Sequence, residues 1–151
     1  MFTNVRYFIK TSIVFMLVGI LSGFYMLISR RLFGFGYGPS MLSAHTHVIL
    51  VGFMVMMIMG VSIWFFPRAE KTDKRYRPAL VSAVYLLMTI GTSFRFTAEF
   101  IDSFITLSFI NIIIVVSSFL QIIAFFIFVY TMWGRVRPVG SQIREAKGER
   151  F

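Results

Sequence analysis

The sequence predicts an all-α integral membrane protein, an antiparallel four-helix bundle with both termini in the cytoplasm. The chain of 151 residues is 58% hydrophobic and only 14% charged. Its apolar residues fall in four blocks, each long enough to cross a hydrocarbon layer of about 30 Å as a helix. Lys and Arg gather in the gaps between these blocks, as the flanks of spanning helices require.

The four predicted helices cover about residues 11–29, 41–66, 79–98 and 104–133. Together they form one transmembrane domain, residues 1–133, because the loops between them leave no room for another domain. The apolar run of the first helix is longer than a signal-peptide core and no cleavage site follows it, so we expect it to remain as an anchor. We expect residues 134–151 to form a polar cytoplasmic tail.

The distribution of positive charge predicts the orientation. All but three of the 15 Lys and Arg lie in the N-terminal segment, the second loop or the tail. The positive-inside rule places these three segments in the cytoplasm. The exceptions are Arg30 and Arg31 in the first outer loop and Arg95 within the third helix. We therefore expect a multi-pass protein of the cell (inner) membrane. Its net charge of +9 is expected to contact anionic lipid head groups, not nucleic acid.

Composition also excludes several kinds of chemistry. Cysteine is absent, which excludes disulfides, thiolate metal sites, iron–sulfur clusters and covalent haem attachment. The predicted helices hold too little polar material to favour a channel or transporter. The carboxylates lie in loops, at helix ends or in the tail, and no nucleophile and base stand together. We expect electron transfer at most.

The two histidines of the chain, His45 and His47, open the second helix. At about 100° per residue they point about 200° apart, so they cannot share one metal ion. Below His45, two turns along the same face, lies Gly52, which offers a flat space beneath an imidazole. This arrangement predicts haem b, with His45 as the ligand of its iron. The alternative is that both histidines lie at the membrane interface or bond to neighbouring helices.

Arginines near the depth of His45 fit the same prediction. Arg95, helped by Arg30 or Arg31, could pair with the haem propionates, since guanidinium binds carboxylate in a bidentate manner. Met88, two turns below Arg95, and His47 complete the predicted cofactor site. The alternative for Arg95 is an ion pair with Glu99, one turn away on the same helix.

The stretch "AHTHVILVGFMVMMIMGVSIWFFPR" resembles the second transmembrane helix of the large subunits of haem–copper oxidases and nitric oxide reductases, the cytochrome c oxidase subunit I-like superfamily. The preceding "LVGILSGFYMLISRRLFG" resembles their first helix. The resemblance implies that His45 is the axial ligand of a low-spin haem, whereas His47 falls where some members have asparagine. It would make this chain a truncated, four-helix member.

The departures from that superfamily limit the function. Its large subunits carry further histidines on later helices for a second haem and a neighbouring metal, and none exist here. The chain alone therefore cannot form a binuclear centre that reduces dioxygen or nitric oxide.

The leading hypothesis is a small membrane b-type cytochrome that binds non-covalent haem near the outer leaflet, for electron transfer or for redox or gas sensing. The second axial ligand could be His45 of a second copy in a homodimer, or Met26 or Met88, or the position could stay open. One alternative is a cofactor-free accessory or assembly subunit of a respiratory complex, with a respiratory-chain partner. Another is copper handling by the methionines below the histidines, Met54, Met56, Met57 and Met59.

Overall fold

A computed structural model describes residues 3–66, 75, 77–105, 107–136, 140, 143–144 and 147–148. Its elements, in chain order, are α1 (Thr3–Arg31), α2 (Pro39–His47), the π-helix η1 (Val48–Val55), α3 (Met56–Phe65), α4 (Pro78–Asp102) and α5 (Ser108–Met132). No strand occurs in this part of the chain. Because α2, η1 and α3 follow one another without a break, they form one span. Four helices are thus long and apolar enough to cross a membrane, which confirms the all-α, membrane-spanning prediction.

The helices differ from the predicted ranges mainly at their ends. α1 begins at Thr3 instead of near residue 11, because Val5 and Phe8 are fully buried while Arg6 and Lys10 stay exposed on the other side of the same helix. Packing of apolar residues against a neighbouring helix stabilises the first turns of a helix even when these turns also carry charged residues. Most of the second loop and of the predicted tail, 134–151, lies outside the described residues.

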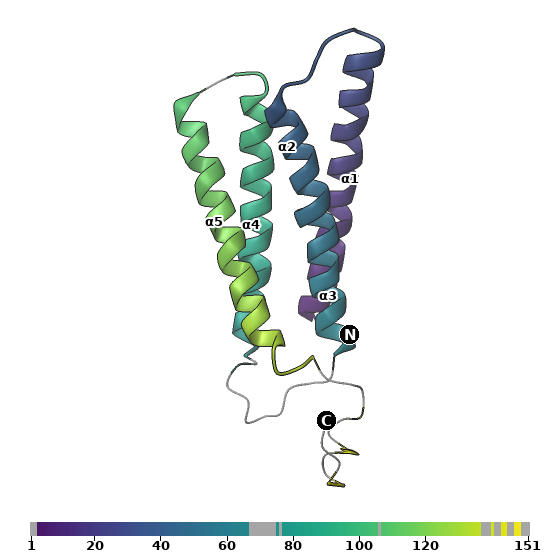
Figure 1. Cartoon of the computed structure of the whole chain (residues 1–151), viewed down its shortest axis with the longest axis vertical. Coiled ribbons are helices and arrows are strands. Elements are labelled where there is room, and N and C mark those ends of the chain that lie inside the picture. Colours follow the sequence, from purple (N-terminus) through teal and green to yellow (C-terminus); the bar gives the residue numbers. More distant parts are fainter. Residues whose placement is uncertain are drawn as a thin grey trace.

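Successive spans are joined at alternate ends of the molecule, as Figure 1 shows, so α1 begins at the same end at which α5 finishes. The opposite end carries the start of α2 and is called the His45 end below. α1 packs against η1 and α3, while α2 packs against α4. α5 packs almost entirely against α4. The first three spans form most of the hydrophobic core, to which α5 contributes Ala124 and Met132.

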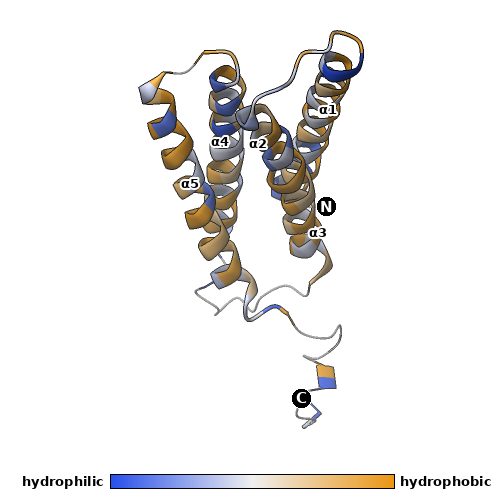
Figure 2. Cartoon of the chain, turned by 45° about the horizontal axis from the view of Figure 1, so that its top comes forward, coloured by the Kyte–Doolittle hydropathy of each residue, from blue (hydrophilic) through white to orange (hydrophobic). Residues whose placement is uncertain are grey.

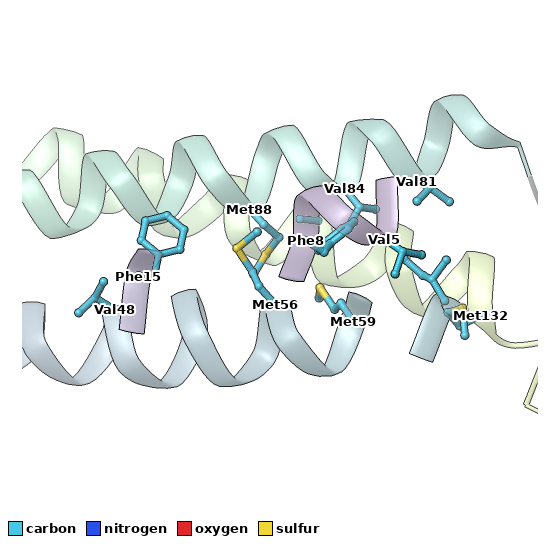
Figure 3. Packing of buried hydrophobic residues seen from close by; sticks show 12 residues of the cluster. Val5, Phe8, Phe15, Val48, Met56, Met59, Val81, Val84, Met88 and Met132 are labelled. Atoms are coloured by element: carbon cyan, nitrogen blue, oxygen red, sulfur yellow. The ribbon is translucent and has the colours of Figure 1, made fainter. Parts of the chain in front are cut away.

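The buried core lies toward the end opposite His45. Met56, Met59 and Met88 are almost fully buried there beside Phe8 (Figure 3).

Large apolar side chains also cover the outside of every span, and Figure 2 shows hydrophobic colour along their length with hydrophilic turns near the His45 end of α1 and α4. Such an exterior suits contact with lipid, in which each helix satisfies its own backbone hydrogen bonds.

Buried polar contacts fix the neighbours in this apolar interior. Gln121 of α5 donates a hydrogen bond of 3.0 Å to the hydroxyl of Thr92 on α4. Beyond the end of α5, the buried Arg135 donates to the carbonyl oxygens of Ile63 and Phe66 at 2.9 and 3.1 Å. Ile63 lies in the last turn of α3 and Phe66 directly follows it, where carbonyl groups have no partner within the helix. Arg135 thereby joins the end of α5 to the second span.

The second span buries a residue at every fourth position, namely Ala44, Val48, Gly52, Met56 and Gly60. In an α-helix, four residues turn about 400°, so such a stripe drifts around the helix by about 40° at each step. The π-helix η1 lies within the stripe and has more residues per turn, because its hydrogen bonds join residues five apart. The smaller rotation per residue in η1 offsets this drift. Gly52 and Met56 therefore face the core on the same side as Ala44, instead of lying below His45.

Candidate functional site

His45 lies in the contact between α1 and α2. A Cβ atom on Gly23 would stand 2.8 Å from Cε1 of the His45 ring, so the imidazole occupies the space that this glycine leaves open. Gly19, one turn before Gly23, makes room for Ile49 in the same way. The two glycines therefore bring two spans of one chain close together, as small residues do in membrane helices.

This close approach places one nitrogen of His45 against the backbone of α1. Nδ1 lies 3.0 Å from the carbonyl oxygen of Gly19 and 3.2 Å from the hydroxyl of Ser22. Because a carbonyl oxygen can only accept, Nδ1 carries the proton and donates. This hydrogen bond leaves Nε2 as the nitrogen that could bind a metal, and Nε2 makes no hydrogen bond to any described residue.

The His45 ring borders a pocket of about 410 Å³ at the His45 end. This pocket, called the His45 pocket below, is lined by Gly23, Met26, Leu27, Arg30, Arg31, Tyr37, Leu42 and His45. Arg30 and Arg31 come from the last turn of α1, where they also interact favourably with the helix dipole. Neither arginine forms an ion pair within the described part of the chain. The pocket thus combines the imidazole of His45 with two guanidinium groups that have no carboxylate partner among the described residues.

Gly52 and Met88 do not line the His45 pocket. A Cβ atom on Gly52 would meet Phe15 and Thr92 at 2.9 Å each, so side chains from α1 and α4 fill the space that the sequence assigned to a macrocycle. Met88 is fully buried in the core. Of the predicted site residues, the structure brings together His45, Arg30 and Arg31.

Arg95 and His47 belong to a separate polar cluster between α2 and α4, called the Glu99 cluster and made of Ser43, His47, Arg95 and Glu99. Arg95 Nε donates to Glu99 Oε1 at 3.1 Å, and the hydroxyl of Ser43 donates to the same oxygen at 2.8 Å. His47 Nδ1 donates to the Ser43 carbonyl at 2.9 Å and lies 3.8 Å from Glu99 Oε2. Arg95 is therefore already paired.

The spacing of Glu99 and Arg95 on one helix predicts only their ion pair, whereas the structure also places Ser43 and His47 beside Glu99. It is only 3% exposed, and its Oε2 has no hydrogen-bond partner among the described residues. Its bond to Ser43 crosses from α4 to α2, and no local pattern marks that pair. Tyr37, which lines the His45 pocket, was likewise missed, because it lies in a loop whose path depends on the packing of α1 and α2.

The metal chemistry of the site rests on one side chain. Within the described residues, no group of three or more His, Cys, Asp or Glu could hold a metal ion. His45 as a single protein ligand suits a metal that brings most of its other ligands with it, as haem iron does.

The methionines considered for copper do not gather around His45. Met56 and Met59 are buried in the core, and Met54 is 47% exposed. Met57 faces α1, where it accepts a hydrogen bond from Ser12. Met56 follows His45 by eleven residues, about 16 Å along a helix at 1.5 Å per residue. None of these four methionines lines the His45 pocket, so the structure does not bring them to the imidazole.

No protein-family model, curated protein or solved structure matches the chain.

Proposed function

We propose that this chain is a small membrane b-type cytochrome, in which Nε2 of His45 is an axial ligand of non-covalently bound haem. One observation carries the proposal: His45, whose Nε2 makes no hydrogen bond to a described residue, lines the same pocket as Arg30 and Arg31. A neutral imidazole is a common axial ligand, and arginine pairs well with the carboxylates of a haem.

The residues of the His45 pocket fit such a group. The Gly19 carbonyl holds the imidazole in the tautomer that a ligand needs and fixes the direction of its ring. Arg30 and Arg31 would hold the propionates, while Leu27 and Leu42 would contact the porphyrin. When bound, the haem would supply one-electron chemistry at its iron. The pocket, at about 410 Å³, lies in the lower part of the range for small-molecule sites, so part of this large group would face lipid or another chain.

The charges support an orientation for the proposed site. We infer that the chain lies in the inner membrane with both termini cytoplasmic, and that the His45 end is the outer end. Arg30 and Arg31 are then unusual, because positive residues are depleted on the outer side. Two carboxylates of a bound haem would compensate these charges.

For the other axial position we propose His45 of a second copy, related to the first by two-fold symmetry. The His45 pocket has only one imidazole, and Met88 lies in the core, away from it. A closed two-fold interface could supply the second ligand from an identical chain. Within the chain, Met26 lines the same pocket and is the competing ligand.

A cofactor-free accessory subunit is the second candidate. The Glu99 cluster and the bond between Gln121 and Thr92 join the spans without any cofactor. On this alternative, the protein would assemble with respiratory-chain partners through its apolar exterior, and replacement of His45 would leave that assembly intact.

Absorption spectroscopy tests the proposal directly. We expect protein purified in detergent from haem-replete cells to show a Soret band, and dithionite to sharpen its α band, as in six-coordinate b-type haem. His45→Ala should abolish the bands, whereas the matched variant His47→Ala should keep them. Protein that is folded by circular dichroism yet lacks haem bands would contradict the proposal and leave the accessory subunit.

A further inference from the structure

A second pocket, of about 240 Å³, lies beside the His45 pocket at the same end of the molecule. We call it the Tyr25 pocket. It is lined by Tyr25, Ser29, Phe35, Gly36, Tyr37, Gly38, Met41, Ser103 and Phe104. These residues come from the end of α1, the following loop, the start of α2 and the end of α4. Tyr37 belongs to both pockets, so their contents would be near neighbours.

The walls of the Tyr25 pocket are largely aromatic. The rings of Tyr25 and Phe104 lie with their centroids 6.3 Å apart at an angle of 56°, which joins α1 to the end of α4. Phe35 contributes a third ring from the loop. Gly36 and Gly38 keep the loop side open, because a Cβ atom on either would meet nothing within 4 Å. Such walls favour a flat, unsaturated ligand.

The polar groups of the Tyr25 pocket are neutral donors. The hydroxyl groups of Tyr25, Ser29 and Tyr37 make no hydrogen bond to other described residues. Ser103 is already committed, since its hydroxyl donates to the Glu99 carbonyl at 2.9 Å. No charged side chain lines the pocket. A charged head group would therefore lose hydration without gaining a counter-charge, whereas carbonyl oxygens would find donors.

We propose that the Tyr25 pocket binds the head ring of a lipid-soluble quinone or its quinol. Such a ring is planar and uncharged, and its oxygens match the free hydroxyl groups. The head ring must be small, because the volume of the pocket lies below the roughly 300–1,000 Å³ of sites for drug-sized molecules. The apolar tail could leave over the exposed Phe104 and Ile105 into the membrane. That the ligand is an electron carrier, and not another flat neutral molecule, rests on the proposed cytochrome function. The presence and shape of the pocket do not depend on that function.

Equilibrium binding of decylubiquinone and menadione to the full chain in nanodiscs tests this inference. We expect saturable binding of at least one of them, and the double variant Tyr25→Phe, Ser29→Ala should weaken it at least tenfold. This loss equals about 1.4 kcal/mol, as expected when two hydrogen bonds to the ring are removed. Tyr7→Phe is the matched control, because Tyr7 is exposed and lines neither pocket, and it should leave binding unchanged.

The same titration on His45→Ala separates this inference from the haem proposal. Retained quinone binding with lost haem bands would support the Tyr25 pocket. If wild-type protein holds no haem but binds quinone with the expected sensitivity to the double variant, the cytochrome function fails and the pocket stands. Binding that is absent, or equal in wild type and double variant, overturns the inference. So does displacement of the quinone by any phospholipid regardless of its charge, which would indicate a lipid site.

Discussion

The two histidines stand two residues apart on one helix, yet they lie in contrasting surroundings. His45 points at α1, where Gly23 leaves space for its ring and the Gly19 carbonyl binds Nδ1. Its ring also lines a pocket with two arginines. His47 points toward α4, where its Nδ1 bonds to the backbone of its own helix and lies near a carboxylate that Arg95 already neutralises.

The difference shows that the neighbouring helix, more than the residue type, decides what an imidazole can do. At the contact of α1 and α2, glycine and an oriented carbonyl prepare a ligand and leave its outer side accessible. At the contact of α2 and α4, opposite charges and hydroxyl groups satisfy one another. In the first region, one nitrogen of His45 has no hydrogen-bond partner among the described residues and could bind a ligand. The second region mainly joins two spans. Three substitutions test this division, in decreasing order of expected effect.

Glu99→Ala should have the largest effect on stability. It would leave the guanidinium of Arg95, whose side chain is only 18% exposed, without its counter-charge inside a span. Breaking a buried pair from one side costs about 3–5 kcal/mol. Unfolding of the purified protein by SDS, followed by circular dichroism, measures the loss. Glu99→Gln is the control, since it keeps the acceptor for Ser43 and should cost less. If both variants were as stable as wild type, the Glu99 cluster would not join α2 to α4.

Gly23→Leu should act on the other region. The added side chain would collide with the His45 ring, and overpacking of this kind costs about 1–3 kcal/mol. Because the ring must move, we expect haem binding to fall at least tenfold, as measured by titration of haem into apoprotein. Gly36→Ala is the control, because its Cβ would meet nothing within 4 Å. Unchanged haem affinity in Gly23→Leu would mean that His45 does not hold the iron.

His47→Ala should have the smallest effect. Polar contacts between membrane helices contribute on average about 0.6 kcal/mol in double-mutant cycles, and Glu99 would keep its bonds to Arg95 and Ser43. SDS unfolding and the haem spectrum should both stay close to those of wild type. A loss of haem comparable to that of His45→Ala would assign His47 to the cofactor site and remove the contrast between the two regions.

Hydropathy alone predicted the four spans well. A helix in lipid satisfies its own backbone, so a long apolar run is sufficient to specify it. Helix ends were less well predicted, as at Thr3, where burial of Val5 and Phe8 extends α1 past charged residues. The arginine partners were predicted in part. Spacing on one helix made Glu99 an alternative partner for Arg95, but the bond from Ser43 to Glu99 joins separate spans and leaves no sequence signal.

The faces of the second span show most clearly what the amino-acid sequence determines. Composition, charge placement and the opposed directions of His45 and His47 follow from the chain itself, because they depend only on residue type and on local helix geometry. Tertiary packing decided that Gly52 faces Phe15 and Thr92, and that Gly23 receives the ring of His45. The physical reason is that η1 changes the rotation per residue below His45, so positions counted along a regular α-helix no longer predict which neighbour each residue meets.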